Sequence, residues 1–320
     1  MLTVVLGLAG ALVYGAADFV GGLAARRISA LRVTALGALS GVVLLIAGAL
    51  VIPGRWSAEA LLWGGISGLT GAVAIALLYA CLAIGPMSIL SPLTAVTSAI
   101  VPLTWGLATG SELGALAYPA FALALVAVVL VGFVPSEGAV RPTARGLIMA
   151  TISGTLIGAF YILMEQTPDD SGLVPLIANR AVNATLMVTV IVLLAIVAGQ
   201  RGMAADARLA VLDGSHGAPH ALESPRGPGG AVRASAAALR GGWRGGIALG
   251  LLCGVLDAGA NVIALVGLRL GDLAVVSVLT ALYPAGTILL AALVLRERIA
   301  RLQWVGLVLA LAASAMLALA

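Results

Sequence analysis

The chain has 320 residues, of which 62% are hydrophobic and only 9% are charged, and its mean hydropathy is +1.16. About a quarter of the residues in a soluble globular domain are charged, so this composition excludes such a domain and indicates a chain surrounded largely by lipid. The formal net charge is +4, every basic residue is an Arg, and nearly all of them lie between or beside apolar segments, which indicates membrane topology rather than nucleic-acid binding.

Apolar segments long enough to cross about 30 Å of hydrocarbon as helices recur along the chain. We predict ten spans, at residues 2–25, 32–52, 60–84, 87–109, 113–134, 146–166, 173–198, 246–268, 273–295 and 302–320. Arg26 and Arg27 follow the first span, which has no basic leader, so we expect a retained anchor rather than a signal peptide. No alternating polarity of the kind that barrel strands need is present, and the fold class is therefore all-α integral membrane.

A polar segment at 200–245 interrupts the series of spans. It holds several Arg residues, both histidines and a Pro- and Gly-rich stretch, and we predict a disordered loop. His216 and His220 are four residues apart, but Pro219 lies between them, so we expect no metal site. Cys81 and Cys253 lie in apolar segments, where we expect small buried side chains rather than a disulfide.

The chain repeats itself. At an offset of 186 residues the third and fourth spans align with the eighth and ninth, and the matching pairs include Gly64 with Gly250, Gly68 with Gly254, Ser91 with Ser277, Leu93 with Leu279 and Thr94 with Thr280. The first span aligns better with the sixth at an offset of 139, with Gly7 on Gly146 and Gly15 on Gly154. The offsets differ by about the length of the polar loop. We therefore predict a five-helix repeat at 1–138 and a second at 139–320 that carries 200–245 as an insertion.

An odd number of spans per repeat turns the second repeat upside down relative to the first. Ten helices in two inverted five-helix repeats are a recurring build of secondary transporters. Among the loops on the N-terminal side, only Arg55 and Arg269 are basic, whereas the other loop arginines lie on the opposite side. The positive-inside rule therefore predicts a multi-pass protein of the cytoplasmic membrane with both termini outside the cytoplasm.

The ninth and tenth spans carry a known pattern of residues. This pattern consists of Ser277 to Pro284, then Arg296-Glu297-Arg298, then Gln303 to Gly306. It resembles the end of an EamA-type domain of the drug/metabolite transporter superfamily, with Arg296 where the family has Gly. The first copy is more divergent, since Pro102 is displaced relative to Pro284. The resemblance covers essentially the whole chain as two domains. It implies a small-metabolite carrier or exporter that does not hydrolyse ATP, with a central cavity lined by spans one, three, four, six, eight and nine.

Two acidic residues inside spans are the best candidates for substrate or proton binding. An ionisable side chain near the centre of a membrane helix costs about 2.5–3.5 kcal/mol, so each asks for an explanation. Asp257 lies in the middle of the eighth span, with Asn261 one turn away on the same face, and Asp18 lies in the first span, one turn after Tyr14. The structural alternatives are an ion pair or hydrogen bond for Asp257, and a hydrated or Arg-paired carboxylate at the membrane edge for Asp18.

A second group of side chains has weaker claims. Arg180 in the seventh span is a candidate partner for an acid, with substrate contact as the alternative. Tyr79, Trp105 and Tyr283 are candidates for lining the cavity, with packing or an interfacial position as the alternative. We expect Glu165, near a span end, to be solvated.

These observations favour a secondary transporter that moves a small metabolite or drug-like solute by alternating access, with the proton as candidate coupling ion. An enzyme is disfavoured, because no His lies in a span and no nucleophile-elbow, zinc-protease or phosphate-loop motif is present. We expect no cofactor, no nucleic-acid partner, and contact with the bilayer and a small-molecule substrate, and a homodimer stays open. The alternative function is a non-transporting membrane sensor or assembly subunit.

Overall fold

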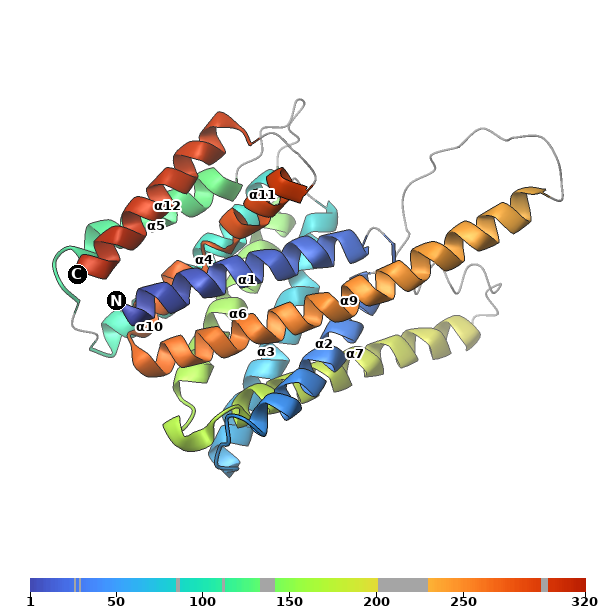
Figure 1. Cartoon of the computed structure of the whole chain (residues 1–320), viewed down its shortest axis with the longest axis horizontal. Coiled ribbons are helices and arrows are strands. Elements are labelled where there is room, and N and C mark those ends of the chain that lie inside the picture. The colour runs from blue at the N-terminus through green and yellow to red at the C-terminus, as the bar shows by residue number, and fades with distance from the viewer. Residues whose placement is uncertain are drawn as a thin grey trace.

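The computed structural model describes residues 1–25, 27–28, 30–84, 87–110, 113–132, 142–200, 230–294 and 299–320, and over these ranges every regular element is a helix (Figure 1). In chain order they are α1 (Leu2–Ala25), α2 (Ala30–Ala49), α3 (Ala58–Ile84), α4 (Met87–Ala108), α5 (Ala117–Gly132), α6 (Ala144–Glu165), the short 3-10 helix η1 (Asp169–Ser171), α7 (Val174–Gln200), α9 (Gly230–Leu270), α10 (Leu273–Thr280), α11 (Tyr283–Val294) and α12 (Arg301–Leu319).

The helices have the length and composition of membrane spans. In the described part of the chain, 8 helical segments are long and apolar enough to cross a bilayer, and α10 and α11 together form one of them. The shorter apolar helices Pro92–Ala108 and Ala117–Gly132 belong to α4 and α5. The outward faces of the helices are apolar too, since Val43 is 69% exposed, Val308 61% and Leu311 68%. Large exposed apolar faces of this kind are stable only against lipid. The protein is a multi-pass, all-helical membrane protein.

One predicted segment is wrong in detail, and another consists of two helices. The loop predicted at 200–245 is helical from residue 230, where α9 begins, because residues 231–240 are rich in Ala, the strongest helix former. Residues 201–229, with His216 and His220, lie outside the described residues. The ninth span, predicted at 273–295, is confirmed as a span at Leu273–Val294, but it consists of two helices, because α10 ends at Thr280 and α11 begins at Tyr283. Pro284 has no N–H to donate to the carbonyl one turn earlier, so a continuous helix would lose a bond there.

The loops at one end of the bundle are locked together. The main-chain N–H of Arg55, between α2 and α3, donates to the carbonyl of Asp170 in η1 at 2.8 Å. Gly172 has a positive φ of +54° and lies against Pro53 and Gly54, where a Cβ on Gly54 would overlap the main chain of Ser171. The Arg269 guanidinium, near the end of α9, donates to the Ser171 hydroxyl at 2.9 Å. The ends of α2, α7 and α9 are therefore tied at one point.

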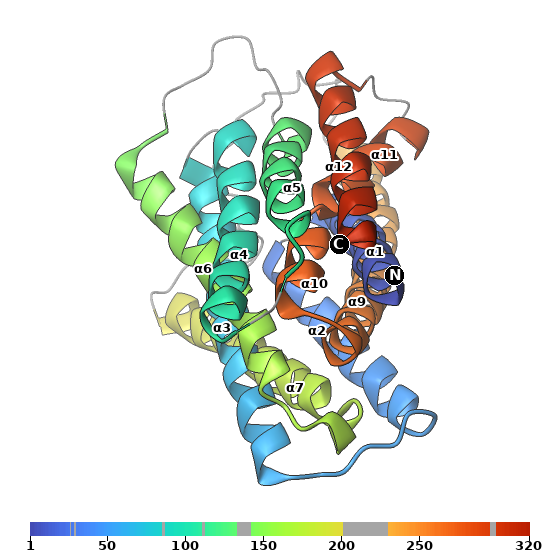
Figure 2. The ribbon, with the colours of Figure 1, turned by 90° about the vertical axis from the view of Figure 1, so that its left-hand side faces the viewer.

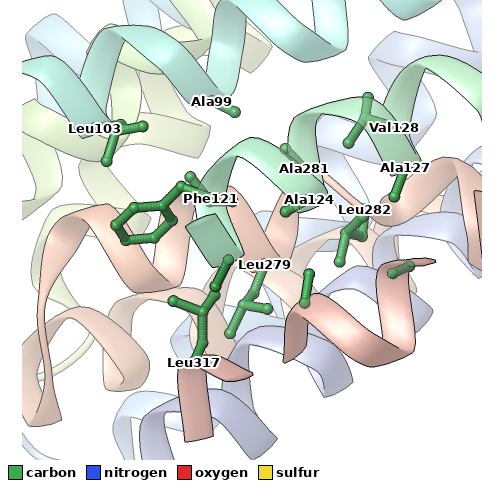
Figure 3. Close-up of a cluster of buried hydrophobic side chains, with 14 of the residues drawn as sticks. Ala99, Leu103, Phe121, Ala124, Ala127, Val128, Leu279, Ala281, Leu282 and Leu317 are labelled. Carbon is green, nitrogen blue, oxygen red and sulfur yellow. The ribbon is translucent and has the colours of Figure 1, made fainter. Parts of the chain in front are cut away.

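Pairs of helices from the two parts of the chain pack side by side. α1 runs along α9 and also contacts α10 and α11, α3 packs on α6 and α7, α2 packs on α9 and α7, and α5 packs on α12 (Figures 1 and 2). Both termini lie at the same end of the bundle (Figure 2). One apolar core joins α4, α5, α10 and α12, where side chains such as Leu103, Phe121, Leu279 and Leu317 meet between small alanines (Figure 3).

Candidate substrate-binding site

Small residues bring α9 against α2 and so position Asp257. A Cβ on Gly254 would overlap the Cα of Gly37, and the hydroxyl of Ser40 donates to the carbonyl of Leu251 at 3.0 Å. This close crossing is typical of membrane helices, where the absence of side chains lets the backbones approach. Asp257 lies about one turn after Gly254, in the middle of the span Arg244–Leu270. The crossing therefore fixes the depth and direction of its carboxylate.

On the other side of α2, helix α7 is fixed to α3. A Cβ on Gly68 would lie 3.0 Å from the Cα of Asn179. The Asn179 amide donates to the hydroxyl of Ser67 at 2.8 Å, and that hydroxyl donates to the carbonyl of Gly64 at 2.6 Å. All of these polar atoms are buried and paired, as buried polar groups require. The next residue, Arg180, is thereby turned away from α3.

Arg180 reaches Asp257 past α2. A Cβ on Gly41 would lie 3.5 Å from the Cδ and 3.6 Å from the Nε of Arg180, so the glycine leaves room for the arginine side chain. Arg180 Nη2 forms an ion pair and hydrogen bond with Asp257 Oδ2. The Arg180 side chain is 12% exposed and that of Asp257 is 31% exposed. Arg180 Nε is buried without a hydrogen-bond partner among the described atoms.

Helix α1 brings Tyr14 and Asp18 to the same place. Tyr14 is near enough to Asp257 and Arg180 to interact with their charges. Its hydroxyl is within hydrogen-bonding reach of Tyr161 on α6. Asp18 is near enough to Asp257 and Tyr283 for the charges of these groups to interact. Asp18 is exposed. It lies on the part of α1 that packs on α9 and α11.

Other predicted residues stand apart from this cluster or play a smaller part in it. The amide of Asn261 donates to the main-chain carbonyl of Asp257 at 2.6 Å and not to its carboxylate. Trp105, near the end of α4, is 44% exposed, which suits an interfacial ring. Tyr79 lies on α3, but its side chain is outside the described residues. Glu165 is exposed at the end of α6, as expected.

Some residues of the cluster were not predicted. Tyr161 is 7% exposed and within hydrogen-bonding reach of both Tyr14 and Thr280. Its ring also packs edge-on against Phe160, with ring centroids 5.3 Å apart. Cys253 lies one turn before Asp257 and in the electrostatic range of Asp18. A search for polar side chains within one turn of the candidate acids would have found Cys253, whereas nothing in the sequence connects Tyr161 to Tyr14.

The described residues contain no group of three or more His, Cys, Asp or Glu side chains that could hold a metal ion. The cluster instead offers two carboxylates, one guanidinium and three phenols in the interior of the bundle. Such groups can bind a charged solute, exchange a proton and change partners.

Comparisons with known proteins agree with this picture of the fold. A crystal structure of another protein aligns with 99% of this chain and 96% of its own, with a TM-score of 0.67 and 15% sequence identity. That likeness shows the fold alone. No curated protein matches the chain. The model of the EamA-like transporter family matches residues 230–319, which hold α9 to α12 and therefore Asp257.

The resemblance at the end of the chain is thus confirmed over these residues. Residues 230–319 are therefore similar to the EamA-like transporter family, which is part of the drug/metabolite transporter superfamily.

Proposed function

We propose that the protein is a secondary transporter that carries a small metabolite or drug-like solute across the cytoplasmic membrane by alternating access, coupled to protons. The observation that carries this proposal is the Arg180–Asp257 pair at mid-span, with Asp18 and Tyr14 of α1 facing it. Charged side chains at this depth are costly, so proteins keep them where they bind a solute or an ion. The side chains of the cluster come from both the N-terminal and the C-terminal part of the chain. A movement of these two parts against each other would therefore change the contacts within the cluster.

Alternating access requires two parts that move against each other, and we propose that they are inverted repeats at 1–138 and 139–320. Glycines that align in the sequence make equivalent contacts. A Cβ on Gly15 would lie 2.6 Å from the main-chain oxygen of Tyr283, and a Cβ on Gly154 would lie 2.5 Å from that of Thr94. In each case a first span of one repeat packs on a fourth span of the other.

The third spans support the same symmetry. Gly68 of α3 packs on α7, and its aligned partner Gly254 of α9 packs on α2, so each third span contacts the second span of the other repeat. At the offset of 186, Asp257 aligns with Gly71, where a Cβ would meet nothing within 4 Å. The first repeat thus leaves open space at the position where the second repeat has its carboxylate.

Proton coupling follows from the two carboxylates. A proton that binds Asp257 would release Arg180, and a proton that binds Asp18 would neutralise the second acid of the cluster. Either event changes the charge between the repeats, and a change of one charge is enough to favour a different packing of the helices. We propose that protonation and solute binding are linked in this way.

The test is flux of a candidate solute into proteoliposomes driven by a pH gradient. Asp257→Asn is expected to abolish gradient-driven flux while the protein stays folded in detergent, and Glu165→Gln, an acid at the exposed end of α6, is the matched control with full flux. Unchanged flux in Asp257→Asn would remove Asp257 from the mechanism. Failure to move any solute, together with binding to a partner protein, would favour a sensor or assembly subunit instead.

A further inference from the structure

The turn that follows α1 is fixed against α9. The main-chain N–H of Arg27 donates to the carbonyl of Ala24 at 2.9 Å, which closes the turn. Ile28 is 5% exposed and belongs to a small apolar core with Ala24 and Val33. A Cβ on Gly246 of α9 would lie only 2.7 Å from Ile28 Cγ2 and 3.1 Å from Arg27 Cβ. The place of Arg27 is therefore set by buried packing, although Arg27 itself is exposed.

Two exposed arginines meet at this turn. A Cβ on Gly245 would overlap Nη1 of Arg27, so the guanidinium of Arg27 lies against the backbone of α9, at the residue after Arg244. Arg244 is exposed as well, and it begins the membrane span Arg244–Leu270. It lies within a helix rather than in a loop, because α9 begins at Gly230 and projects beyond α1 (Figure 1). The structure thus holds two cations together at the boundary of a span.

No described acidic residue lies at this end of the bundle. In the part of the chain that the structure describes, Asp18 and Asp257 lie inside spans, and the other acids lie at the opposite end, namely Glu59, Glu165, Asp169, Asp170 and Asp272. Neither Arg27 nor Arg244 forms an ion pair with any of them. Neighbouring like charges repel each other, and an anion from outside the chain would relieve this repulsion.

An apolar stripe of α9 continues from Arg244 into the membrane. Ala248 is exposed, and Leu251, Leu252 and Val255 are 39%, 46% and 39% exposed. These residues follow Arg244 at the spacing of one face of a helix. An exposed apolar stripe beneath a pair of cations matches a phospholipid, which has an anionic headgroup and an acyl chain. A free phosphate ion would use only the cations.

We propose that Arg27 and Arg244 bind the headgroup of an anionic phospholipid, one acyl chain of which lies along the stripe of α9. The guanidinium groups donate to the phosphate oxygens, which their planar donors fit in pairs. Basic positions between membrane helices at the bilayer surface recognise anionic headgroups in this way. The lipid would join α1 to α9 at the end of the bundle remote from the locked loops. Its binding does not depend on whether the protein moves a solute.

Native mass spectrometry of the full chain, released from a neutral detergent, measures the affinity for single lipids. The probes are dioleoyl phosphatidylglycerol and dioleoyl phosphatidylcholine, which have the same acyl chains and differ in net charge. Because each Arg near an anionic lipid contributes a factor of about five, we expect phosphatidylglycerol to bind about 10–30 times more tightly. Equal affinity for the two lipids would overturn the proposal.

Variants test the position. Arg27→Gln and Arg244→Gln are each expected to weaken phosphatidylglycerol binding about fivefold, and the double variant to bind the two lipids within about twofold. The affinity for phosphatidylcholine stays unchanged, which reports that the variants are folded. The controls with full preference are Arg145→Gln, at the exposed start of α6 on the same side of the bundle, and Arg55→Gln on the opposite side. An unaltered preference in the double variant, or an equal loss in Arg145→Gln, would overturn the assignment.

Thermal unfolding in detergent separates a lipid from a free anion. Phosphatidylglycerol is expected to raise the midpoint of unfolding, whereas sodium phosphate raises it no more than sodium chloride of the same ionic strength does. The rise with phosphatidylglycerol is lost in the double variant. A rise with sodium phosphate alone that equals the rise with the lipid would overturn the choice of a lipid and indicate a site for a free anion.

Discussion

The ion pair between Arg180 and Asp257 is the contact at the site whose loss we expect to destabilise the protein most. Arg180→Met keeps an unbranched apolar stem beside Gly41 but leaves the carboxylate of Asp257 without its cation. Asp257→Leu leaves the guanidinium without its anion. The double variant replaces both charges by apolar groups that are compatible with the surrounding helices, so the three variants form a double-mutant cycle.

The size of the effect follows from the burial of the pair. Removing one member of a fully buried ion pair costs about 3–5 kcal/mol, whereas replacing both members by apolar groups is nearly neutral. Arg180 is 12% exposed, but Asp257 is 31% exposed, and solvent weakens the penalty for an unpaired carboxylate. We therefore expect about 2–3 kcal/mol for Arg180→Met, less than about 1 kcal/mol for the double variant, and a coupling energy of about 1–3 kcal/mol.

Reversible unfolding in mixed micelles with increasing dodecyl sulfate measures these free energies. The matched control is Arg55→Met, because Arg55 pairs with Asp170 at 3.6 Å where the side chains are 77% and 59% exposed. A surface pair of this kind contributes at most about 1 kcal/mol. Additive losses in the cycle, or an Arg180→Met protein as stable as the parent, would refute the view that the pair supports the helix arrangement.

Three further substitutions test the packing around the site. Gly71→Leu fills the open space at the position that aligns with Asp257, and we expect it to block flux without loss of folded protein. The control is Gly259→Leu, which lies on the opposite face of α9 from Asp257, also has open space around it, and should leave flux unchanged. Equal flux in both variants would contradict the assignment of the space at Gly71. Gly254→Leu is expected to prevent close packing on α2 and lower the yield of folded protein, measured by size-exclusion chromatography in detergent, and a normal yield would argue against that crossing. Asn179→Ala leaves the Ser67 hydroxyl without its donor and should cost about 1–3 kcal/mol in the micelle assay, and no loss would mean that α7 is held by other contacts.

Helix positions could be predicted from the sequence because they depend on local composition. The first span was predicted at 2–25 and α1 occupies Leu2–Ala25, since a hydrophobic stretch in lipid must bond its own backbone. The prediction failed where local signals conflict. The beginning of α9 is Ala-rich yet carries charges, which suggested a loop. The span predicted at 273–295 was correct in its bounds, but the break before Pro284 that divides it into α10 and α11 was not foreseen.

The candidate acids were visible in the sequence, but their roles in the cluster were not. A carboxylate in an apolar segment is conspicuous by itself, so Asp18 and Asp257 could be named at once. Arg180 is 77 residues from Asp257, and no pattern in the sequence says which of the two acids it meets. The outcome depends on how closely Gly41 and Gly254 allow three helices to approach. Tyr161 was missed for the same reason, since only packing brings α6 to α1.

Composition and span length by themselves determined that this is a helical membrane protein with acids at membrane depth, because transfer of each segment into lipid depends on its own residues. The tertiary structure decided that Arg180 pairs with Asp257, whereas no described cation pairs with Asp18. That division depends on atomic contacts between helices distant in the chain, which small residues at the crossings make and which hydrophobicity alone does not specify.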